Sequence, residues 1–428
     1  MLDIKLIREN PFLVKTNLEK RQSKEYLGVF DKLIVVDKET RELLKETEEL
    51  RFKRNKITAE IQKGISSKKN VSDALKEAKL LPIQLKEKEQ KLFLLKKEFE
   101  ELLYKLPNLL HDSVPFGKDD SENKEIKKEG KIPVFDFELK HHGKLAVELN
   151  GADFERAVKI SGTGFYFLKG ELALLEHALR NLAIDILFKK GYLLVHPPFL
   201  MKRKPYSGVT DLNDFENVMY KLENQDLYLI ATSEHPIVAM HMDETLDEKN
   251  LPLKFVGCSA CFRKEVGKHG LDERGLFRVH QFNKIEQVIF CKEEDSEKFH
   301  EELLRNSEDF LKLLGIPFRV VNVCTGDIGV VASKKYDIEA YSPREKKYIE
   351  VMSCSNCTDF QARRLNIKYF DGKEKKLVHT LNNTMVATAR MLRLILENFQ
   401  TKQGTVKIPK ALWPYMLGLK ELKPNKKV

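Results

Sequence analysis

Two stretches near the N-terminus repeat apolar residues at every seventh position, and this pattern restricts the fold more than any other feature. Such a repeat is typical of helices that supercoil around one another, because it forms one continuous apolar seam. The first stretch has no proline and is dense in Glu, Lys, Arg and Leu. The repeat consists of Val36, Leu43, Leu50 and Ile57 within residues 31–65, and of Leu85, Leu92 and Phe99 within residues 71–106.

The segment between these stretches, GISSKKN, contains residues that interrupt helices, among them Gly64 and Asn70. Two heptad stretches joined by a short turn predict an antiparallel helical hairpin. Pro82 lies inside the second stretch, where its missing backbone N–H predicts a kink or a restart of the helix.

Basic side chains crowd the end of the predicted hairpin that is nearest its turn. Glu60 is the one acidic residue among them. One interpretation is an ordinary solvated helix tip, and the other is an arm that grips a phosphate backbone. The position at the far end of a rod favours the second interpretation. The residues expected to contact nucleic acid are Arg51, Lys53, Arg54, Lys56, Lys68 and Lys69.

The composition excludes several classes of protein. The chain has 428 residues, of which 42% are hydrophobic and 33% charged, as in globular proteins of two or three domains. No apolar run approaches the ~18–20 residues of a membrane-spanning helix. The first residues, MLDIKLIREN, lack the apolar core of a secretory signal. The net charge of +10 is compatible with a nucleic-acid partner, and equally with a lysine-rich proteome.

The six cysteines all lie at or beyond position 258, too sparsely for a disulfide framework, so we expect a reducing, cytoplasmic environment. They include two CxxC pairs, Cys258–Cys261 and Cys354–Cys357. Four thiolates could bind zinc. Both pairs, however, lie in strand-like sequence without the glycine turns of zinc knuckles, which favours small buried residues near a site.

The composition of residues 107–131 is that of a linker, and the sequence after it mixes strands and helices. Runs of strands without regular helix alternation predict an α+β body with an antiparallel sheet. We expect helices at 172–187, 296–314 and 385–399, and strands at 192–196, 227–230, 254–258, 287–291, 319–323 and 347–352.

One strand-like stretch, FRVHQFNKIEQ, carries the residues best suited to chemistry. Period-two alternation puts five polar or aromatic side chains on one of its faces, which could hold a flat base, a phosphate and an amine. An ordinary polar sheet face is an equally good interpretation of the pattern alone. The chain has neither a GxxxxGK[ST] loop nor a GxGxxG after a strand, so a nucleotide would be held without a glycine-rich loop. The five residues are Arg278, His280, Phe282, Lys284 and Glu286.

Taken in order along the chain, seven segments resemble the seryl-tRNA synthetases, a class II aminoacyl-tRNA synthetase family, and the likeness covers essentially the whole length. The last of these segments resembles the family's third class motif, and its Asn382–Thr384 stretch is closer to the archaeal and eukaryotic branch. The segments are LPNLLHDSVPFGKDDSEN, GADFERAVKISGTGFYFLKGELALLEHAL, GYLLVHPPFL, ATSEHP, CFRKEVG with DERGLFRVHQFNKIE, IEVMSCSNCTDFQARR, and HTLNNTMVATARMLRLILENFQ.

This resemblance implies an antiparallel class II sheet flanked by helices, preceded by a coiled-coil arm that grips the variable arm of tRNA-Ser. It implies a tRNA-binding arm domain at 1–112 and a catalytic domain at 113–428, which includes a linker at 113–135. It also implies L-serine, ATP and Mg²⁺ as ligands, no zinc, and a cytoplasmic homodimer. Whether tRNA-Sec is also a substrate stays open.

The resemblance further implies a role for each motif residue. Arg263 should bind the α-phosphate, Phe282 should stack beneath the adenine, and Arg390 should hold the γ-phosphate. Mg²⁺ should be held by Glu350 and Ser353. The serine-binding residues should be Thr232, Ser233, Glu234, Glu286 and Thr384. The ATP-binding residues should be Arg263, Lys264, Glu265, Val279, Phe282, Glu350, Val351, Met352, Ser353 and Arg390.

Two alternatives remain beside serine activation. A coiled-coil RNA-binding paralogue without aminoacylation activity would retain the basic arm, although such a protein would usually lose Arg263, Glu286 or Arg390. A class II enzyme for threonine or proline is the other alternative, and the SCSNC stretch and the heptad arm disfavour it.

Overall fold

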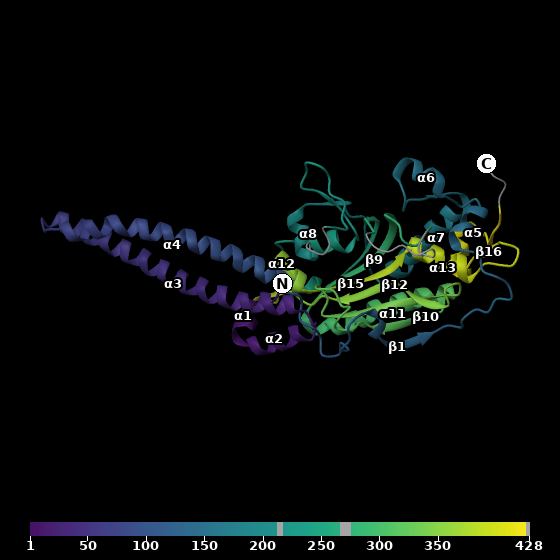
Figure 1. Ribbon diagram of the computed structural model, residues 1–428, viewed down its shortest axis with the longest axis horizontal. Coiled ribbons are helices and arrows are strands. Elements are labelled where there is room, and N and C mark those ends of the chain that lie inside the picture. Colours follow the sequence, from purple (N-terminus) through teal and green to yellow (C-terminus); the bar gives the residue numbers. More distant parts are fainter. Residues whose placement is uncertain (212–216, 266–274, 425–428) are drawn as a thin grey trace. The chain divides into compact units, whose positions relative to one another are not determined.

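The computed structural model describes residues 1–211, 217–265 and 275–424, which form two compact units (Figure 1). The first unit comprises Met1–Leu109, and the second begins at Leu110. Within the described ranges, every helix is too short or too polar to span a bilayer.

The first unit is helical, and two of its helices form a long antiparallel pair (Figure 1). This arrangement confirms the predicted hairpin, because the heptad side chains Val36, Leu43 and Ile57 are buried together with Leu85 and Leu92. Its helices are α1 (Ile4–Glu9), α2 (Pro11–Glu19), α3 (Lys24–Ser66) and α4 (Ser72–Lys105).

The ends of the paired helices differ from the sequence prediction. Helix α3 begins earlier than expected, at Lys24, because the hydroxyl of Ser23 accepts a hydrogen bond from the backbone N–H of Tyr26. Helix α4 runs through Pro82 without a break, so the predicted restart is wrong. The ring of Pro82 lies on the exposed side of the helix.

A buried acid connects α1 with α3. Asp37 is 4% exposed, and its carboxylate accepts hydrogen bonds from Arg8 at 2.6 Å and from Arg41 at 2.9 Å. Burial raises the pKa of Asp37, but the hydrogen bonds and charges of the two guanidinium groups outweigh burial and hold the pKa below its usual value.

The second unit is built on an eight-stranded sheet with the order β1-β10-β11-β12-β15-β9-β8-β4. All neighbouring strands are antiparallel except β4 and β8, so the predicted α+β antiparallel body is confirmed. The strands are β1 (Lys124–Glu129), β4 (Leu193–Val195), β8 (Leu253–Phe262), β9 (Gln281–Cys291), β10 (Phe318–Asn322), β11 (Lys334–Ser342), β12 (Lys347–Asn356) and β15 (His379–Ala387).

Helices and small sheets complete the second unit. The helices are α5 (His142–Glu148), α6 (Phe154–Ser161), α7 (Gly170–Lys189), α8 (Arg203–Val209), α10 (Glu234–Ala239), α11 (Ser296–Leu314), α12 (Phe360–Leu365) and α13 (Thr388–Asn398), with 3-10 turns η1 (Asp120–Glu122), η2 (Glu248–Asn250), η4 (Glu293–Asp295) and η5 (Lys410–Met416). The small sheets contain β2 (Ala152–Asp153), β3 (Phe167–Leu168), β5 (Leu200–Met201), β6 (Tyr228–Leu229), β7 (Thr245–Asp247), β13 (Lys368–Phe370), β14 (Lys375–Leu377), β16 (Val406–Lys407) and β17 (Glu421–Leu422).

Two sequence predictions for this unit need correction. The expected helix at 385–399 begins only at Thr388, because residues 379–387 form β15, a buried strand that the sequence analysis missed. The segment predicted to be a linker contains β1, which pairs with β10 at the edge of the sheet.

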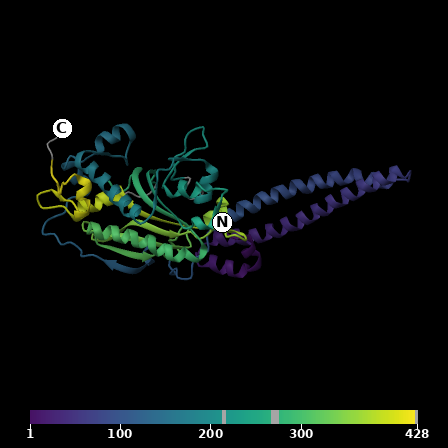
Figure 2. The same cartoon turned by 180° about the vertical axis from the view of Figure 1, so that it is seen from behind.

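Helix α11 covers one face of the sheet and leaves the other face for a cavity (Figure 2, α11 in green). On β9, the side chain of Gln287 reaches Ser307 of α11 at 3.3 Å, and Asn383 of β15 reaches the same hydroxyl at 2.9 Å. Because side chains alternate along a strand, Glu286 and Thr384 point to the opposite face.

Leu33→Ala should destabilise the first unit by about 2–5 kcal/mol, because the Leu33 side chain is fully buried and its removal leaves a cavity. Leu13→Ala is the matched control, since Leu13 is 52% exposed in the same unit, and it should cost no more than about 0.5 kcal/mol. Urea unfolding followed by far-UV circular dichroism measures both. Equal effects would contradict this assignment of the core.

Candidate active site

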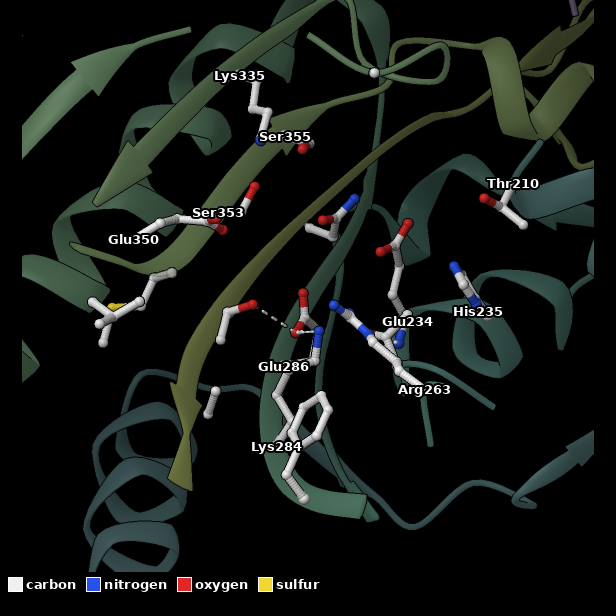
Figure 3. Close-up of a pocket in the computed structure, with 18 of the residues that line it drawn as sticks. Thr210, Glu234, His235, Arg263, Lys284, Glu286, Lys335, Glu350, Ser353 and Ser355 are labelled. Carbon is white, nitrogen blue, oxygen red and sulfur yellow. Dashed lines mark hydrogen bonds and ion pairs between the residues drawn. The ribbon is translucent and has the colours of Figure 1, made fainter. Parts of the chain in front are cut away.

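A cavity of about 460 Å³ lies on the open face of the sheet, and most of the predicted site residues line it (Figure 3). Figure 3 shows Glu286 near its centre, with Arg263 and Glu234 on one side and Glu350 and Ser353 on the other. The predicted residues that line the cavity are Thr232, Glu234, Arg263, Glu265, Val279, Phe282, Glu286, Glu350, Val351, Met352, Ser353, Thr384 and Arg390.

The central carboxylate is Glu286, which is 1% exposed. Lys284, on the same face of β9, lies 2.7 Å from Glu286 Oε2. Thr384, directly opposite on β15, donates its hydroxyl hydrogen to the same oxygen at 3.2 Å. Both contacts are made to Oε2, whereas neither is made to Oε1, and Glu286 lines the cavity. Oε1 is therefore the oxygen available to a ligand.

A second carboxylate, Glu234, begins helix α10. The side chain of Gln361 donates to Glu234 Oε1 at 3.0 Å, and Gln361 is itself held by the hydroxyl of Thr380 at 2.6 Å. Burial, followed by repulsion from Glu286, raises the pKa of Glu234 to about 7. An ammonium group between the two carboxylates would relieve that repulsion.

Gly257 lets the loop before α10 approach the sheet. It pairs with Glu286 in the register of β8 and β9. A methyl group at Gly257 would come within 2.5 Å of Ser233 Oγ and 2.6 Å of Ile237 Cδ1. Ser233 is fully buried and does not line the cavity, so its predicted contact with serine stays a prediction.

The end of β8 contributes Arg263, whose guanidinium carbon lies 5.5 Å from the ring centroid of Phe282. Its Nε donates to the carbonyl of Ala231 at 3.4 Å. Glu265 lines the same part of the cavity with φ of 46°, a left-handed conformation that non-glycine residues rarely adopt. Lys264, predicted to bind ATP, is exposed and does not line the cavity.

Glu350 and Ser353 reach the cavity together because β12 contains a bulge. Three positions apart on a regular strand, they would point to opposite faces. Glu339 pairs with Glu350 and Ile338 pairs with Met352, which leaves Val351 as the extra residue. The backbone carbonyl of Glu350 accepts a hydrogen bond from Arg390 at 2.8 Å.

Charge at this end of the cavity is concentrated. Burial raises the pKa of Glu350, but the positive charges of Arg390, Lys335 and Arg263 outweigh burial and hold the pKa below its usual value. Asp337 of β11 pairs with Ser353 in the strand register, and burial raises the pKa of Asp337 to about 7, although Lys335 lies 3.0 Å away. The sequence analysis did not find Asp337 or Lys335, because it did not predict β11, the strand that carries both residues.

His235 also lines the cavity and was missed as a site residue, although the ATSEHP segment contains it. Burial, followed by the charges of Lys284 and Arg263, lowers the pKa of His235 to about 3. Its imidazole is therefore neutral. His280, just before β9, does not line the cavity and stacks on Phe165 with 5.1 Å between ring centroids. The other four residues predicted to share its face, Arg278, Phe282, Lys284 and Glu286, all line the cavity.

In the first unit, the predicted nucleic-acid contacts differ in their surroundings. Arg51 pairs with Glu89 at 2.7 Å, and Lys53 pairs with Glu77 across the helical hairpin. Arg54, Lys56, Lys68 and Lys69 are exposed.

All six cysteines are free and buried; Cys258 and Cys261 lie in β8, Cys354 lies in β12, and Cys357 directly follows β12. Cys357 lines the cavity beside Asn382, whose side-chain nitrogen lies 3.6 Å from the Cys357 sulfur. Burial raises the pKa of both Cys354 and Cys357 well above the usual value, which favours neutral thiols over metal-binding thiolates. The expectation that the chain binds no zinc stays a prediction.

The cavity thus combines a carboxylate pair, suited to an amine and a hydroxyl, with arginines placed to bind phosphate groups. Residues 266–274, which join the two halves of the CFRKEVG and DERGLFRVHQFNKIE motif, lie outside the described residues.

Two family models match the chain. The tRNA synthetase class II core domain (G, H, P, S and T) matches residues 218–399, and the Seryl-tRNA synthetase N-terminal domain matches residues 1–110.

Relatives and solved structures match over the full length. A Serine–tRNA ligase of Methanocella arvoryzae is 54% identical over 99% of this chain and 100% of its own. The crystal structure of seryl-tRNA synthetase from Pyrococcus horikoshii complexed with ATP superimposes with a TM-score of 0.95 at 46% identity, covering 100% of both chains. The cytoplasmic Serine-tRNA ligase from Naegleria fowleri in complex with AMP gives a TM-score of 0.90 at 34% identity, covering 100% of this chain and 99% of that one.

The fold and the cavity define the core of a class II aminoacyl-tRNA synthetase. About half of the residues are identical to those of the Methanocella arvoryzae and Pyrococcus horikoshii proteins, over nearly the whole chain, and this makes the assignment more specific. The chain belongs to the seryl-tRNA synthetase family, as the motif resemblance predicted.

If the ammonium group of serine binds at Glu234, as the sequence predicts, the serine KM should fall as the pH rises through about 7, because the carboxyl group then loses its proton. In Glu234→Gln this pH dependence should disappear and the serine KM should be high at every pH. ATP–pyrophosphate exchange across a pH series measures the effect, and the ATP KM serves as the internal control. An unchanged pH profile in the variant would exclude Glu234 as the titrating group.

Proposed function

We propose that this chain activates L-serine with ATP and transfers the serine to the 3′ end of tRNA-Ser. The serine carboxylate attacks the α-phosphate of ATP, the bond to the β-phosphate breaks, and seryl-adenylate and pyrophosphate form. The terminal 3′-hydroxyl of the tRNA then attacks the activated carbonyl and releases AMP. The chain's residues act chiefly by alignment and charge, so the first step needs no protein nucleophile.

The observation that carries this proposal is the environment of Glu286. Lys284 and Thr384 both contact Oε2, so Oε1 can accept from the hydroxyl of serine. A buried carboxylate that loses this partner is destabilised, so the pocket rejects alanine, while lack of room for a methyl group rejects threonine. Glu234 and Thr232 are proposed to hold the α-amine.

Other residues that line the cavity, on both sides of Glu286, are proposed to bind ATP. Arg263 binds the α-phosphate and stabilises charge as it develops in the transition state. Its position over Phe282 is consistent with an adenine stacked on that ring and contacted by Glu265. Arg390 holds the γ-phosphate. Val279, Val351 and Met352 contact the nucleotide through backbone and shape.

Glu350 and Ser353 are proposed to hold Mg²⁺ with the phosphates of ATP. Mg²⁺ prefers oxygen ligands. In nucleotide sites it is usually held by only one or two protein carboxylates together with the phosphates of the substrate. The carboxylate of Glu350 and the hydroxyl of Ser353 both line the cavity, so the donor set fits this ion. When bound, Mg²⁺ would neutralise phosphate charge.

Two features support assembly as a homodimer. Strand β4, in the GYLLVHPPFL segment, lies at an edge of the large sheet, where its backbone can pair with another strand. Leu193 of this strand is 60% exposed, and Phe188 near the end of α7 is 64% exposed, so apolar side chains are available for a partner surface. The free, reduced cysteines and the translation activity support the cytoplasm as the location.

The functional division is proposed to follow residues 1–112 as the tRNA-binding arm and 113–428 as the catalytic domain with its linker. The exposed basic side chains near the turn of the helical hairpin are suited to the phosphates of the tRNA variable arm. Full-length likeness to proteins named as serine ligases gives no support to a paralogue without activity.

Glu286→Ala should reduce serine-dependent ATP–pyrophosphate exchange by about 100-fold or more, because losing a buried charged hydrogen bond costs about 3 kcal/mol. Glu308→Ala is the matched control. Glu308 is also a buried acid, 4% exposed and 2.6 Å from Lys127, but it does not line the cavity. No serine-dependent exchange by the folded wild-type protein would overturn the proposed function, and equal losses in both variants would overturn the role of Glu286.

Replacing Lys56, Lys68 and Lys69 together by Ala should raise the KM for tRNA-Ser by about tenfold or more and lower its salt dependence. Exchange without tRNA should not change. The matched control replaces Lys38, Lys45 and Lys97, three exposed lysines of the same hairpin, and removes the same charge. If both triple variants weaken tRNA binding equally, the contact is not concentrated near the turn.

A further inference from the structure

The largest fully buried side chain in the described residues is a charged one, Arg393. It lies on α13, one turn after Arg390. Burying a guanidinium group is very unfavourable unless charged and polar partners surround it. Its position and partners therefore call for a physical explanation, which the sequence motifs do not provide.

Two carboxylates accept hydrogen bonds from Arg393. Its Nε donates to Glu397 Oε1 at 2.8 Å, and its terminal nitrogen pairs with Glu345 in the turn between β11 and β12. Glu397 is fully buried and also accepts from the hydroxyl of Ser342. Burial raises the pKa of Glu397, but His142, Arg393 and Ser342 outweigh burial and lower it to about 2.

The cluster extends to the segment that forms the cavity wall. His142, on α5, lies 3.4 Å from Glu397 through Nδ1. Its other ring nitrogen, Nε2, accepts a hydrogen bond from the backbone N–H of Leu276 at 3.3 Å, which places a ring proton on Nδ1, toward the carboxylate. The next residue is Phe277, which lines the cavity.

Phe277 also joins the two arginines of α13. The guanidinium carbon of Arg393 lies 4.4 Å from its ring centroid, and that of Arg390 lies 5.3 Å away. A guanidinium over an aromatic ring is a favourable contact with a defined geometry. The buried cluster thereby reaches Arg390 through one ring and through the shared helix.

We propose that Arg393 is a positioning residue for ATP, which acts through Phe277 to hold Arg390 at the triphosphate end of the cavity. This inference rests on the proposed function, in which Arg390 binds the γ-phosphate. A flat guanidinium donates to two carboxylates in fixed directions while its face lies on a ring, whereas a lysine ammonium is a compact point charge without that planar geometry. Arg393→Lys therefore retains the positive charge but removes the planar group that fixes the positions of the two carboxylates and the ring.

The chain contains a matched control in Arg319 of β10. Arg319 pairs with Glu339 at 2.6 Å and with Glu125 at 3.3 Å, and it lies 5.2 Å from the ring centroid of Tyr348. Like Arg393, Arg319 therefore pairs with two carboxylates and lies near one aromatic ring. Whereas Phe277, the ring partner of Arg393, lines the cavity, neither Arg319 nor its partners line it. Arg319→Lys should leave nucleotide binding unchanged.

The test compares the binding of ATP and AMP by calorimetry, without serine, in Arg393→Lys, Glu345→Gln, Arg319→Lys and the wild type. AMP lacks the phosphates that Arg390 would contact. Arg393→Lys should weaken ATP binding about tenfold, or about 1.4 kcal/mol, and leave AMP binding within about twofold. Glu345→Gln, whose partly exposed side chain makes misfolding a smaller concern, should change ATP binding in the same direction by less.

Equal weakening of ATP and AMP, or no change for either nucleotide in both cluster variants, would overturn the inference. So would an ATP-specific loss in Arg319→Lys of the same size. Because the calorimetry needs no serine, these outcomes decide the inference separately from the exchange assay. Failure of the wild type in serine-dependent exchange would overturn the proposed function and leave the ATP-to-AMP comparison intact.

Discussion

The pairing register of β9 with its two neighbours is the constraint on which the rest of the catalytic unit depends. Gly257 of β8 and Thr384 of β15 both lie opposite Glu286. A slip of one residue would turn Glu286 and Lys284 toward α11 and bring Gln287 into the cavity. The hydrogen bonds of Gln287 and Asn383 to Ser307 oppose that slip, because they occupy the covered face.

This register gathers charges that would be costly to bury separately. Lys284 offsets Glu286, and the remaining repulsion between Glu286 and Glu234 leaves a place for a substrate cation. At the other end of the cavity, Arg390 and Lys335 lower the pKa of Glu350. The free site thus has charge complementary to an amino acid at one end and to phosphates at the other. Complementary charge in a sheltered cavity is the basis of both affinity and catalysis.

Sequence patterns predicted those elements whose burial is periodic. The heptads identified the helical hairpin, and the amphipathic run at 296–314 coincides with α11. Sequence patterns failed for β15, because a strand buried on both faces shows no alternation of polar and apolar residues. Its polar residues Asn382 and Asn383 also resemble a loop. Pro82 was misjudged as a break, since an exposed proline within a long helix held by its partner can be tolerated.

By itself, the sequence determined the helical hairpin, the α+β body and the family, because local periodicity and motif order are properties of the chain. Only the tertiary structure decided which motif residues share one cavity. The bulge at Val351 turns Glu350 and Ser353 to the same face, and no spacing rule anticipates it. The same holds for Arg393, whose partners are Glu397 of α13 itself, Glu345 in the turn after β11 and the ring of Phe277, since a buried cluster of this kind exists only once distant segments meet.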